Sequence, residues 1–266
     1  PICLRGNVSE IMGNLRVTVD TAAGQAVYFP SLSLRDGSVS TLTEKGSVYN
    51  FTPGAIHGAP QIRELYSEDF DYTDSVGNTG HYTYRVPQLE ADTEGAVSIN
   101  RGIEREYGPF VEEALACRDD GDSISCAYIV WETYQYGDIL SLVMTCAWDN
   151  DMNQYSVYLY DTANGTRLTT AELLAQMGVD ETAFLAAVRQ AAAERFDGNY
   201  AGITGDFDDF LAERRAWTLS DDNINIDVMV AYPDENGQLH VVLPIGSIAG
   251  ADAYEEWLTP ELGAAG

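Results

Sequence analysis

Residues 124–148 read ISCAYIVWETYQYGDILSLVMTCAW, two apolar runs joined at Gln135-Tyr136-Gly137. Runs of this length, rich in Val, Ile, Tyr and Trp and interrupted by a glycine, are typical of a β-hairpin. A three-residue loop ending in glycine matches a type I turn followed by a bulge, with the glycine in the left-handed conformation. The stretch therefore predicts a central hairpin made of strands 124–134 and 138–148.

The predicted turn also sets a register, because it places Tyr134 opposite Asp138 and Cys126 opposite Cys146. Directly opposed residues have Cβ atoms about 4.5–5.5 Å apart, which is near the reach of a disulfide. We expect Cys126 and Cys146 to form either a disulfide or a buried pair of thiols, with Cys117 as a rival partner. The face that we expect to be buried consists of Cys126, Tyr128, Val130, Leu142, Met144 and Cys146.

The segments around the hairpin alternate between strand and helix signals. Before it, a strand at 82–86 precedes helical spacing over 94–117, which Gly108-Pro109 should kink or divide. After it come strands 155–160 and 166–168, helices that begin after Thr169 and Asp180, strands 225–231 and 239–243, and an amphipathic segment 251–258. This order predicts an α+β fold, an antiparallel β-sheet with helices packed on one face.

The N-terminal quarter of the chain has a different amino-acid composition. Residues 1–75 are rich in Gly, Ser, Thr and strand formers, and turn signals such as Pro53-Gly54 interrupt them. The acidic stretch Ser67–Gly80 is the best candidate for a linker or an exposed loop. We therefore expect a small β-rich N-terminal segment, residues 1–75, followed by an α+β domain, residues 76–266.

Charge restricts the partners of the chain. The 266 residues include 42 acidic and 14 basic side chains, and the formal net charge is −28. Such a surface repels phosphate backbones and anionic lipids, so we expect neither nucleic-acid binding nor adsorption to an anionic membrane surface. The same surface attracts basic partners.

The chain contains no run of 18 apolar residues, so its sequence predicts no membrane span. We expect that a signal peptide or anchor once preceded Pro1.

Signals for catalysis or metal binding are weak. His57, His81 and His240 do not have the spacing of metal ligands. Asp149–Asn153 has oxygen donors at alternate positions, like half of a calcium loop, but Gln154 and Tyr160 occupy the positions that require Gly and Glu. No phosphate loop or nucleophile elbow is present. We expect no catalytic residues, no metal ligands and no cofactor.

The aromatic residues of the hairpin are the best candidates for a binding surface. Trp131, Tyr134, Tyr136 and Trp148 lie within the two predicted strands or at their turn. Together they could form a surface for a sugar or a protein. The alternative is that these side chains only pack the sheet against a helix.

Several motifs, taken in order, resemble a known family. They are Tyr82–Pro87, Ile99-Asn100, Tyr136–Leu142, Tyr160–Thr169, Asp234–Gly237 and Val241–Pro244. They are similar to the extracytoplasmic domain shared by RsiV-type anti-sigma factors and PdaC-type peptidoglycan deacetylases, over about residues 80–258. Two segments differ: Trp148–Tyr155 lacks the family's Gly-Ala-His element, and Gly246–Gly250 replaces its Ala-Pro-Tyr-Ala segment.

The resemblance implies a non-catalytic α+β module outside the cytoplasmic membrane, secreted or anchored to the cell envelope by a segment outside this chain. In the anti-sigma members this domain binds lysozyme, and animal-type lysozymes are basic. We therefore expect a binding or sensing module for a basic, lysozyme-like protein or for cell-wall glycan. Two alternatives remain: a glycan hydrolase with two acids about 5–10 Å apart, or a structural lipoprotein scaffold whose N-terminal segment docks a neighbour.

Overall fold

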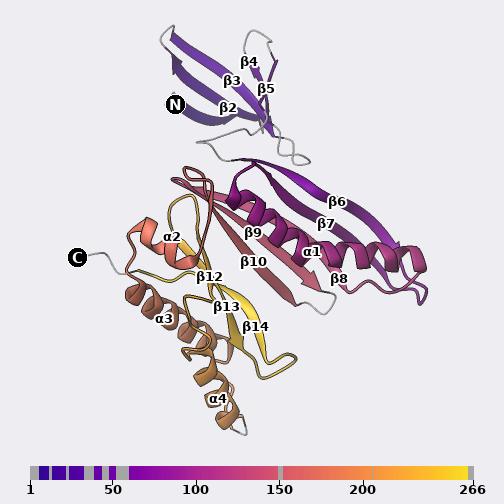
Figure 1. The fold of residues 1–266 in the computed structure, drawn as a ribbon, viewed down its shortest axis with the longest axis vertical. Coiled ribbons are helices and arrows are strands. Elements are labelled where there is room, and N and C mark those ends of the chain that lie inside the picture. The colour runs from indigo at the N-terminus through magenta and orange to yellow at the C-terminus, as the bar shows by residue number, and fades with distance from the viewer. Residues whose placement is uncertain are drawn as a thin grey trace. The chain divides into compact units, whose positions relative to one another are not determined.

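The computed structural model describes residues 60–148, 152–205 and 207–262, together with the backbone of five strands between residues 6 and 51. The chain divides into two compact units, residues 1–61 and residues 62–266 (Figure 1). The first unit holds an antiparallel meander in the order β1 (Gly6–Ile11), β2 (Asn14–Thr21), β3 (Gly24–Leu32), β4 (Val39–Thr43) and β5 (Val48–Phe51). The β-rich N-terminal segment is therefore confirmed.

The second unit is built on a large sheet with strand order β11-β10-β9-β8-β7-β6 in its described part. The strands are β6 (Gln61–Thr73), β7 (Thr79–Glu90), β8 (Cys126–Tyr136), β9 (Ile139–Trp148), β10 (Asn153–Asp161) and β11 (Thr166–Leu168). The pairs β8–β9, β9–β10 and β10–β11 are antiparallel, whereas β7 and β8 are parallel. The sheet is mixed because helix α1 (Glu94–Asp120) lies between β7 and β8 in the chain and is long enough for a parallel crossover.

The expected linker at Ser67–Gly80 is wrong, because these residues form the end of β6, the start of β7 and the turn between them. In β6 the exposure alternates strictly along the strand. Asp69 and Asp71 lie on the exposed face, while Phe70 and Tyr72 are half-buried on the other. The acids are therefore the solvent face of an edge strand. The first unit accordingly ends at Gln61, earlier than the expected boundary at residue 75.

A second, smaller sheet has the order β12 (Val230–Pro233), β13 (Leu239–Gly246) and β14 (Ala253–Leu258). The remaining described helices are α2 (Thr170–Met177), α3 (Glu181–Asn199) and α4 (Asp208–Thr218). Figure 1 shows α1 lying across the large sheet, and α3 and α4 beside the small sheet. Since α3 contacts β13 and β14, and α4 contacts β13, these helices cover the small sheet.

The centre of the large sheet is buried on both faces, which explains the almost continuous apolar sequence of β9. One face packs against α1, whose fully buried residues include Ile99, Ile103 and Tyr107. The other face contributes Val143 and Leu159 to a core shared with α2, α3 and the small sheet. The α+β class and the helical cover are thus confirmed. The prediction placed helices on one face of the sheet, whereas the face opposite α1 packs against α2, α3 and the small sheet.

Local helix signals were good predictors. Thr169 and Glu172 form the predicted capping box of α2, and the side chain of Asp180 caps α3 by accepting from Ala183 N–H. Gly108-Pro109 does not divide the helix, because α1 runs through both residues, and the alternative of a kink at this point stays a prediction. A proline inside a helix costs about 3 kcal/mol. The buried residues of α1 continue in helical register on both sides of Pro109. Their packing offsets the free-energy cost of the proline.

The central hairpin is confirmed, but its predicted register is wrong. Tyr136 pairs with Ile139 across a two-residue turn of Gly137 and Asp138, in which Gly137 has a φ of 57°. This turn places Ile129 opposite Cys146, and Cys126, beyond a register shift, pairs with Trp148. The predicted three-residue loop fails because Tyr136 continues strand β8.

A register shift between Cys126 and Tyr128 disturbs the alternation at the start of β8. As a result Tyr128 is 37% exposed, whereas Ile129 is fully buried. The predicted burial of Tyr128 is therefore wrong, although Leu142, Met144 and both cysteines are buried as expected.

Three further differences concern the C-terminal third. The predicted strand 225–231 begins only at Val230, the segment 251–258 forms strand β14, and α4 was not predicted. Asp208 and Asp209 lie in the first turn of α4, a common place for acids. Within the described ranges, no helix is both long enough and apolar enough to cross a membrane.

Candidate functional site

The structure separates the four aromatic residues that were predicted to form one surface. Trp148 lies at the open end of the hairpin and packs edge-on against Phe110 of α1, with ring centroids 5.0 Å apart. Tyr136 lies at the turn end, where its ring is so close to Gly237 that a Cβ there would lie 2.6 Å from Tyr136 Cε2. Trp131 and Tyr134 alone line a common cavity.

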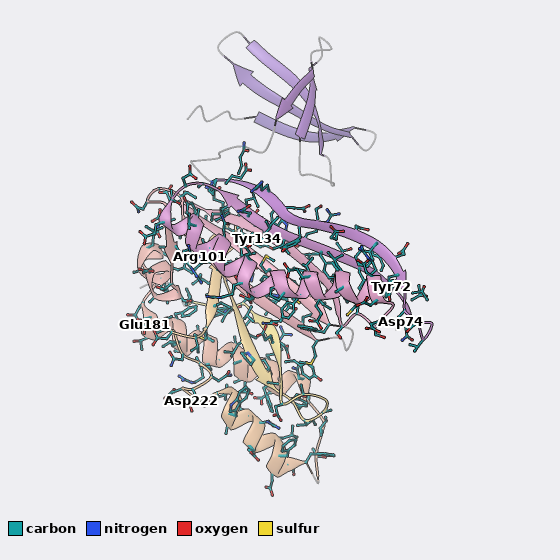
Figure 2. All side chains as sticks on the ribbon, turned by 45° about the vertical axis from the view of Figure 1, so that its right-hand side comes forward. Tyr72, Asp74, Arg101, Tyr134, Glu181 and Asp222 are labelled. Carbon is teal, nitrogen blue, oxygen red and sulfur yellow. The ribbon has the colours of Figure 1, made fainter. Side chains whose placement is uncertain are left out.

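That cavity is a groove of about 260 Å³ between the large and the small sheet. We call it the aromatic groove. Strand β8, on which Figure 2 labels Tyr134, supplies one wall, β9 supplies the adjoining wall, and the small sheet closes the groove from the other side. The residues that line it are Val130, Trp131, Glu132, Tyr134, Val143, Thr145, Tyr232 and Trp257.

Strand periodicity decides which side chains face the groove. Residues two apart in a strand share a face, so Glu132 and Tyr134 point to the same side of β8, and the register places Glu132 opposite Val143. Trp131 alternates with them and pairs with the fully buried Met144, so its side chain belongs to the α1 face. Tyr134 is therefore the predicted residue whose ring enters the groove.

In the small sheet, pairing brings two further rings to one face. Tyr232 pairs with His240, and Val242, two residues further along β13, pairs with Trp257. Because His240 and Val242 share a face of β13, Tyr232 and Trp257 share it as well. Sequence reasoning missed both aromatic residues. The available signal was the Asn236-Gly237 turn, which sets the register of Tyr232 with His240.

The rings hold one another in place. The centroids of Tyr134 and Tyr232 are 4.9 Å apart at an interplanar angle of 32°, and those of Tyr232 and Trp257 are 5.4 Å apart at 85°. Tyr155 of β10 extends the series, with its ring 5.0 Å from that of Trp257. These separations lie in the range preferred by aromatic pairs. The aromatic wall is therefore formed before any ligand arrives.

Glu132 supplies the charge of the groove. Tyr134 Oη donates to Glu132 Oε2 over 2.7 Å. This hydrogen bond, together with burial, raises the pKa of Tyr134, so the phenol stays protonated at neutral pH. Among the described residues that line the groove none is Lys or Arg, and no ion pair within the described ranges involves Glu132. The groove thus combines aromatic faces with an unpaired carboxylate.

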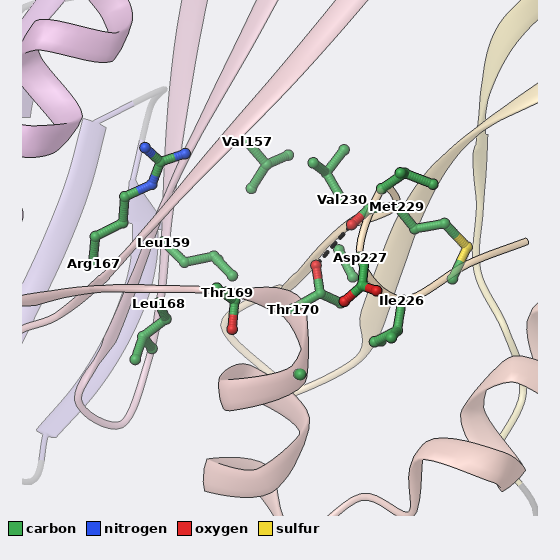
Figure 3. Close-up of a pocket in the computed structure, with 13 residues that line it drawn as sticks. Val157, Leu159, Arg167, Leu168, Thr169, Thr170, Ile226, Asp227, Met229 and Val230 are labelled. Atoms are coloured by element: carbon green, nitrogen blue, oxygen red, sulfur yellow. Dashed lines mark hydrogen bonds between the residues drawn. The ribbon is translucent and has the colours of Figure 1, made fainter.

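A larger cavity of about 500 Å³ lies elsewhere in this unit, between β10, the start of α2 and the segment before β12 (Figure 3). Its walls include the apolar side chains of Val157 and Leu159, and Thr170 Oγ1 donates to the carbonyl of Met229 over 2.8 Å. Arg167 and Asp227 supply one charge of each sign. None of the predicted site residues lies in this cavity.

Two carboxylates from different elements accept hydrogen bonds from β10. Glu106 of α1 accepts from Ser156 Oγ over 2.5 Å and from Tyr158 Oη over 2.7 Å. Glu255 of β14 accepts from the N–H of Tyr155 over 2.7 Å. Burial raises the pKa of Glu255, the hydrogen bond from Tyr155 opposes that shift, and the charge of Glu106 adds to it. The two acids thus interact electrostatically.

The cysteine pair is close in space despite the changed register. Cys126 Sγ and Cys146 Sγ are 3.5 Å apart, both residues are buried, and both are free thiols. The hydrogen bond to Cys146 and burial raise the pKa of Cys126, so the thiol form prevails at neutral pH. Cys117 is also a free thiol and is half-buried.

Metal-site predictions can be compared only in part. Across the described ranges, no three His, Cys, Asp or Glu side chains are grouped in a way that could hold a metal ion. The predicted half calcium loop includes Asp149, Asn150 and Asp151, which lie outside the described residues, as does His57.

Comparison with known proteins adds no relative. No protein-family model matches the chain. No curated protein matches its sequence. The resemblance to the RsiV and PdaC type of extracytoplasmic domain therefore stays a prediction.

Proposed function

We propose that this chain is a non-catalytic extracytoplasmic module that binds a basic protein of the animal lysozyme type. The observation that carries the proposal is the aromatic groove, in which Glu132 has no cationic partner among the described residues and lies beside the rings of Tyr134, Tyr232 and Trp257. Such a groove offers contact area and negative charge. It favours recognition of a positively charged surface.

The net charge supports the same kind of partner at longer range. A formal charge of −28 attracts a basic protein before contact. Electrostatic steering of this kind raises association rates by about 10-fold to 1,000-fold at low salt, and salt screens it. The negative charge of the chain favours a partner of positive net charge, and the aromatic groove supplies a place for specific contact.

Calorimetric titration with an animal-type lysozyme tests the proposal. We expect binding at about 50 mM salt that weakens at least tenfold at about 500 mM salt, where the screening length falls to a few ångströms. Lysozyme whose lysines have been succinylated is the matched control, because it keeps its size while its charge changes sign. Absence of binding to the unmodified protein at both salt concentrations would contradict the proposal.

The electrostatic interaction between Glu106 and Glu255 favours a second candidate, a glycan hydrolase. Retaining and inverting glycosidases use two carboxylates, one of them a protonated acid with a raised pKa. Glu255 has a raised pKa, and Tyr155 and Trp257 lie next to it. Release of reducing sugar from purified peptidoglycan, abolished in both Glu106→Gln and Glu255→Gln, would favour this function. Its absence in the wild type would reject it.

A further inference from the structure

We infer that the aromatic groove binds the cationic head group of a partner's Arg or Lys side chain, with Glu132 as its counter-ion. This inference rests on the proposed function, since it names the chemical group of the basic partner that enters the groove. The juxtaposition that carries it is a carboxylate and three aromatic rings around one cavity of about 260 Å³.

The first step of the argument is charge. Glu132 is exposed, and its Oε2 atom accepts a hydrogen bond from Tyr134 Oη. No cation within the described ranges forms an ion pair with the Glu132 carboxylate. A carboxylate accepts hydrogen bonds at both oxygens and donates none. A guanidinium or ammonium group donates and never accepts, so it complements the group that the groove leaves unpaired.

The second step is the aromatic wall. A cation within about 6 Å of a Trp or Tyr ring centroid is attracted by the electron density on the ring face. Tyr134, Tyr232 and Trp257 line the groove, and their contacts with one another fix the ring positions. Because the wall is already ordered, binding loses little side-chain entropy. The same principle operates elsewhere in this protein, where the guanidinium of Arg214 lies 4.8 Å from the ring centroid of Phe210.

The third step distinguishes a cation from a sugar. A sugar presents several hydroxyl groups that both donate and accept, and it needs partners of both kinds. The polar groups that line the groove are the carboxylate of Glu132, the hydroxyls of Tyr134, Thr145 and Tyr232, and the indole N–H of Trp257. No Asn, Gln, Lys or Arg is among its described lining residues. Among these described groups only Glu132 carries a formal charge, and a cationic ligand compensates that charge whereas a neutral sugar does not.

Nuclear magnetic resonance titration with N-methylguanidinium tests the inference, with N-methylurea as the neutral probe of similar shape. We expect N-methylguanidinium to shift the indole N–H signal of Trp257, which a Trp257→Phe variant assigns, and to bind at least tenfold more tightly than N-methylurea. Glu132→Gln should weaken binding of the cation about tenfold. Glu104→Gln removes the same charge from an exposed position on α1 and should change it less than twofold.

Two variants of Tyr134 distinguish loss of the aromatic ring from loss of the fold. Tyr134→Phe keeps the ring and should retain cation binding, whereas Tyr134→Leu removes the ring and should weaken it. Equal binding of both probes, or tighter binding of chitooligosaccharide than of the cation, would overturn the inference. If N-methylguanidinium fails while lysozyme still binds, the inference falls and the proposed function stands. If the cation binds but no basic protein does, the proposed function falls instead.

Discussion

Single aspartates fix the hairpin turns of the second unit. Asp74, Asp161 and Asp234 each accept backbone N–H groups from residues two to four positions further on. Asp74 also accepts from Ser123 Oγ over 2.6 Å, which connects the β6–β7 turn to the segment after α1. The hydrogen bond from Ser123 is the main reason why the pKa of Asp74 falls to about 2, and the bonds from Asn78 and Val76 add to it although burial opposes them.

This shift predicts an acid-dependent loss of stability. Since the folded pKa of Asp74 lies below the unfolded value of about 3.9, its contribution is present above that value and is lost as the pH falls toward 2. Asp74→Ala should therefore lower the thermal midpoint by several degrees at pH 7 and by much less near pH 2. Thermal unfolding followed by circular dichroism over this range measures both. An equal deficit at every pH would contradict the assignment.

Glu255 predicts the opposite pH dependence. Its pKa is raised by burial and by Glu106, so its favourable contribution is present below the unfolded value of about 4.3 and is lost as the pH rises through the folded pKa. Glu255→Gln keeps an acceptor for Tyr155 N–H and should raise the thermal midpoint at pH 7 but not near pH 4. Glu256→Gln is the matched control, because Glu256 pairs with Arg195 and its loss should not stabilise the fold. A destabilised Glu255→Gln variant at pH 7 would refute this account.

At the scale of elements, the hairpin β8–β9 shows what local sequence can and cannot determine. The two strands and their glycine-containing turn follow from strand-forming residues and Gly137, but the register depends on whether Tyr136 belongs to the loop or to the strand. Pairing of Tyr136 with Ile139 places Tyr136 in the strand. The cap at Thr169 was predictable because its partners lie within three residues. The continuity of α1 through Pro109 was not, because it depends on the sheet beneath.

The same hairpin predicts a specific disulfide. With 3.5 Å between their sulfurs, Cys126 and Cys146 should bond under an oxidising glutathione buffer, and the bond should stabilise the unit by about 3 kcal/mol. Both cysteines lie on one tryptic peptide, residues 119–167, so mass spectrometry of a non-reduced digest should show this peptide lighter by two hydrogens and not joined to another peptide. Cys117→Ser should leave the linkage unchanged. A Cys117–Cys126 linkage in the wild type would contradict the prediction.

At the scale of the whole second unit, function depends on layers that no single segment encodes. A mixed sheet with α1 on one face meets a smaller sheet on the other, and the aromatic groove opens where the two sheets face each other. Tyr134 was predictable as a candidate from its place in an aromatic-rich strand. Tyr232 and Trp257 were not, because they lie far away in the chain and only tertiary packing brings them to it.

The affinity of the intact chain for an animal-type lysozyme, compared between Glu132→Gln and Glu104→Gln at about 50 mM salt, tests the central claim most directly. Both variants lose one negative charge, so long-range attraction changes equally. The aromatic groove predicts that Glu132→Gln binds about tenfold more weakly than the wild type, while Glu104→Gln stays within twofold. Equal affinities for the two variants would show that the partner does not use the groove.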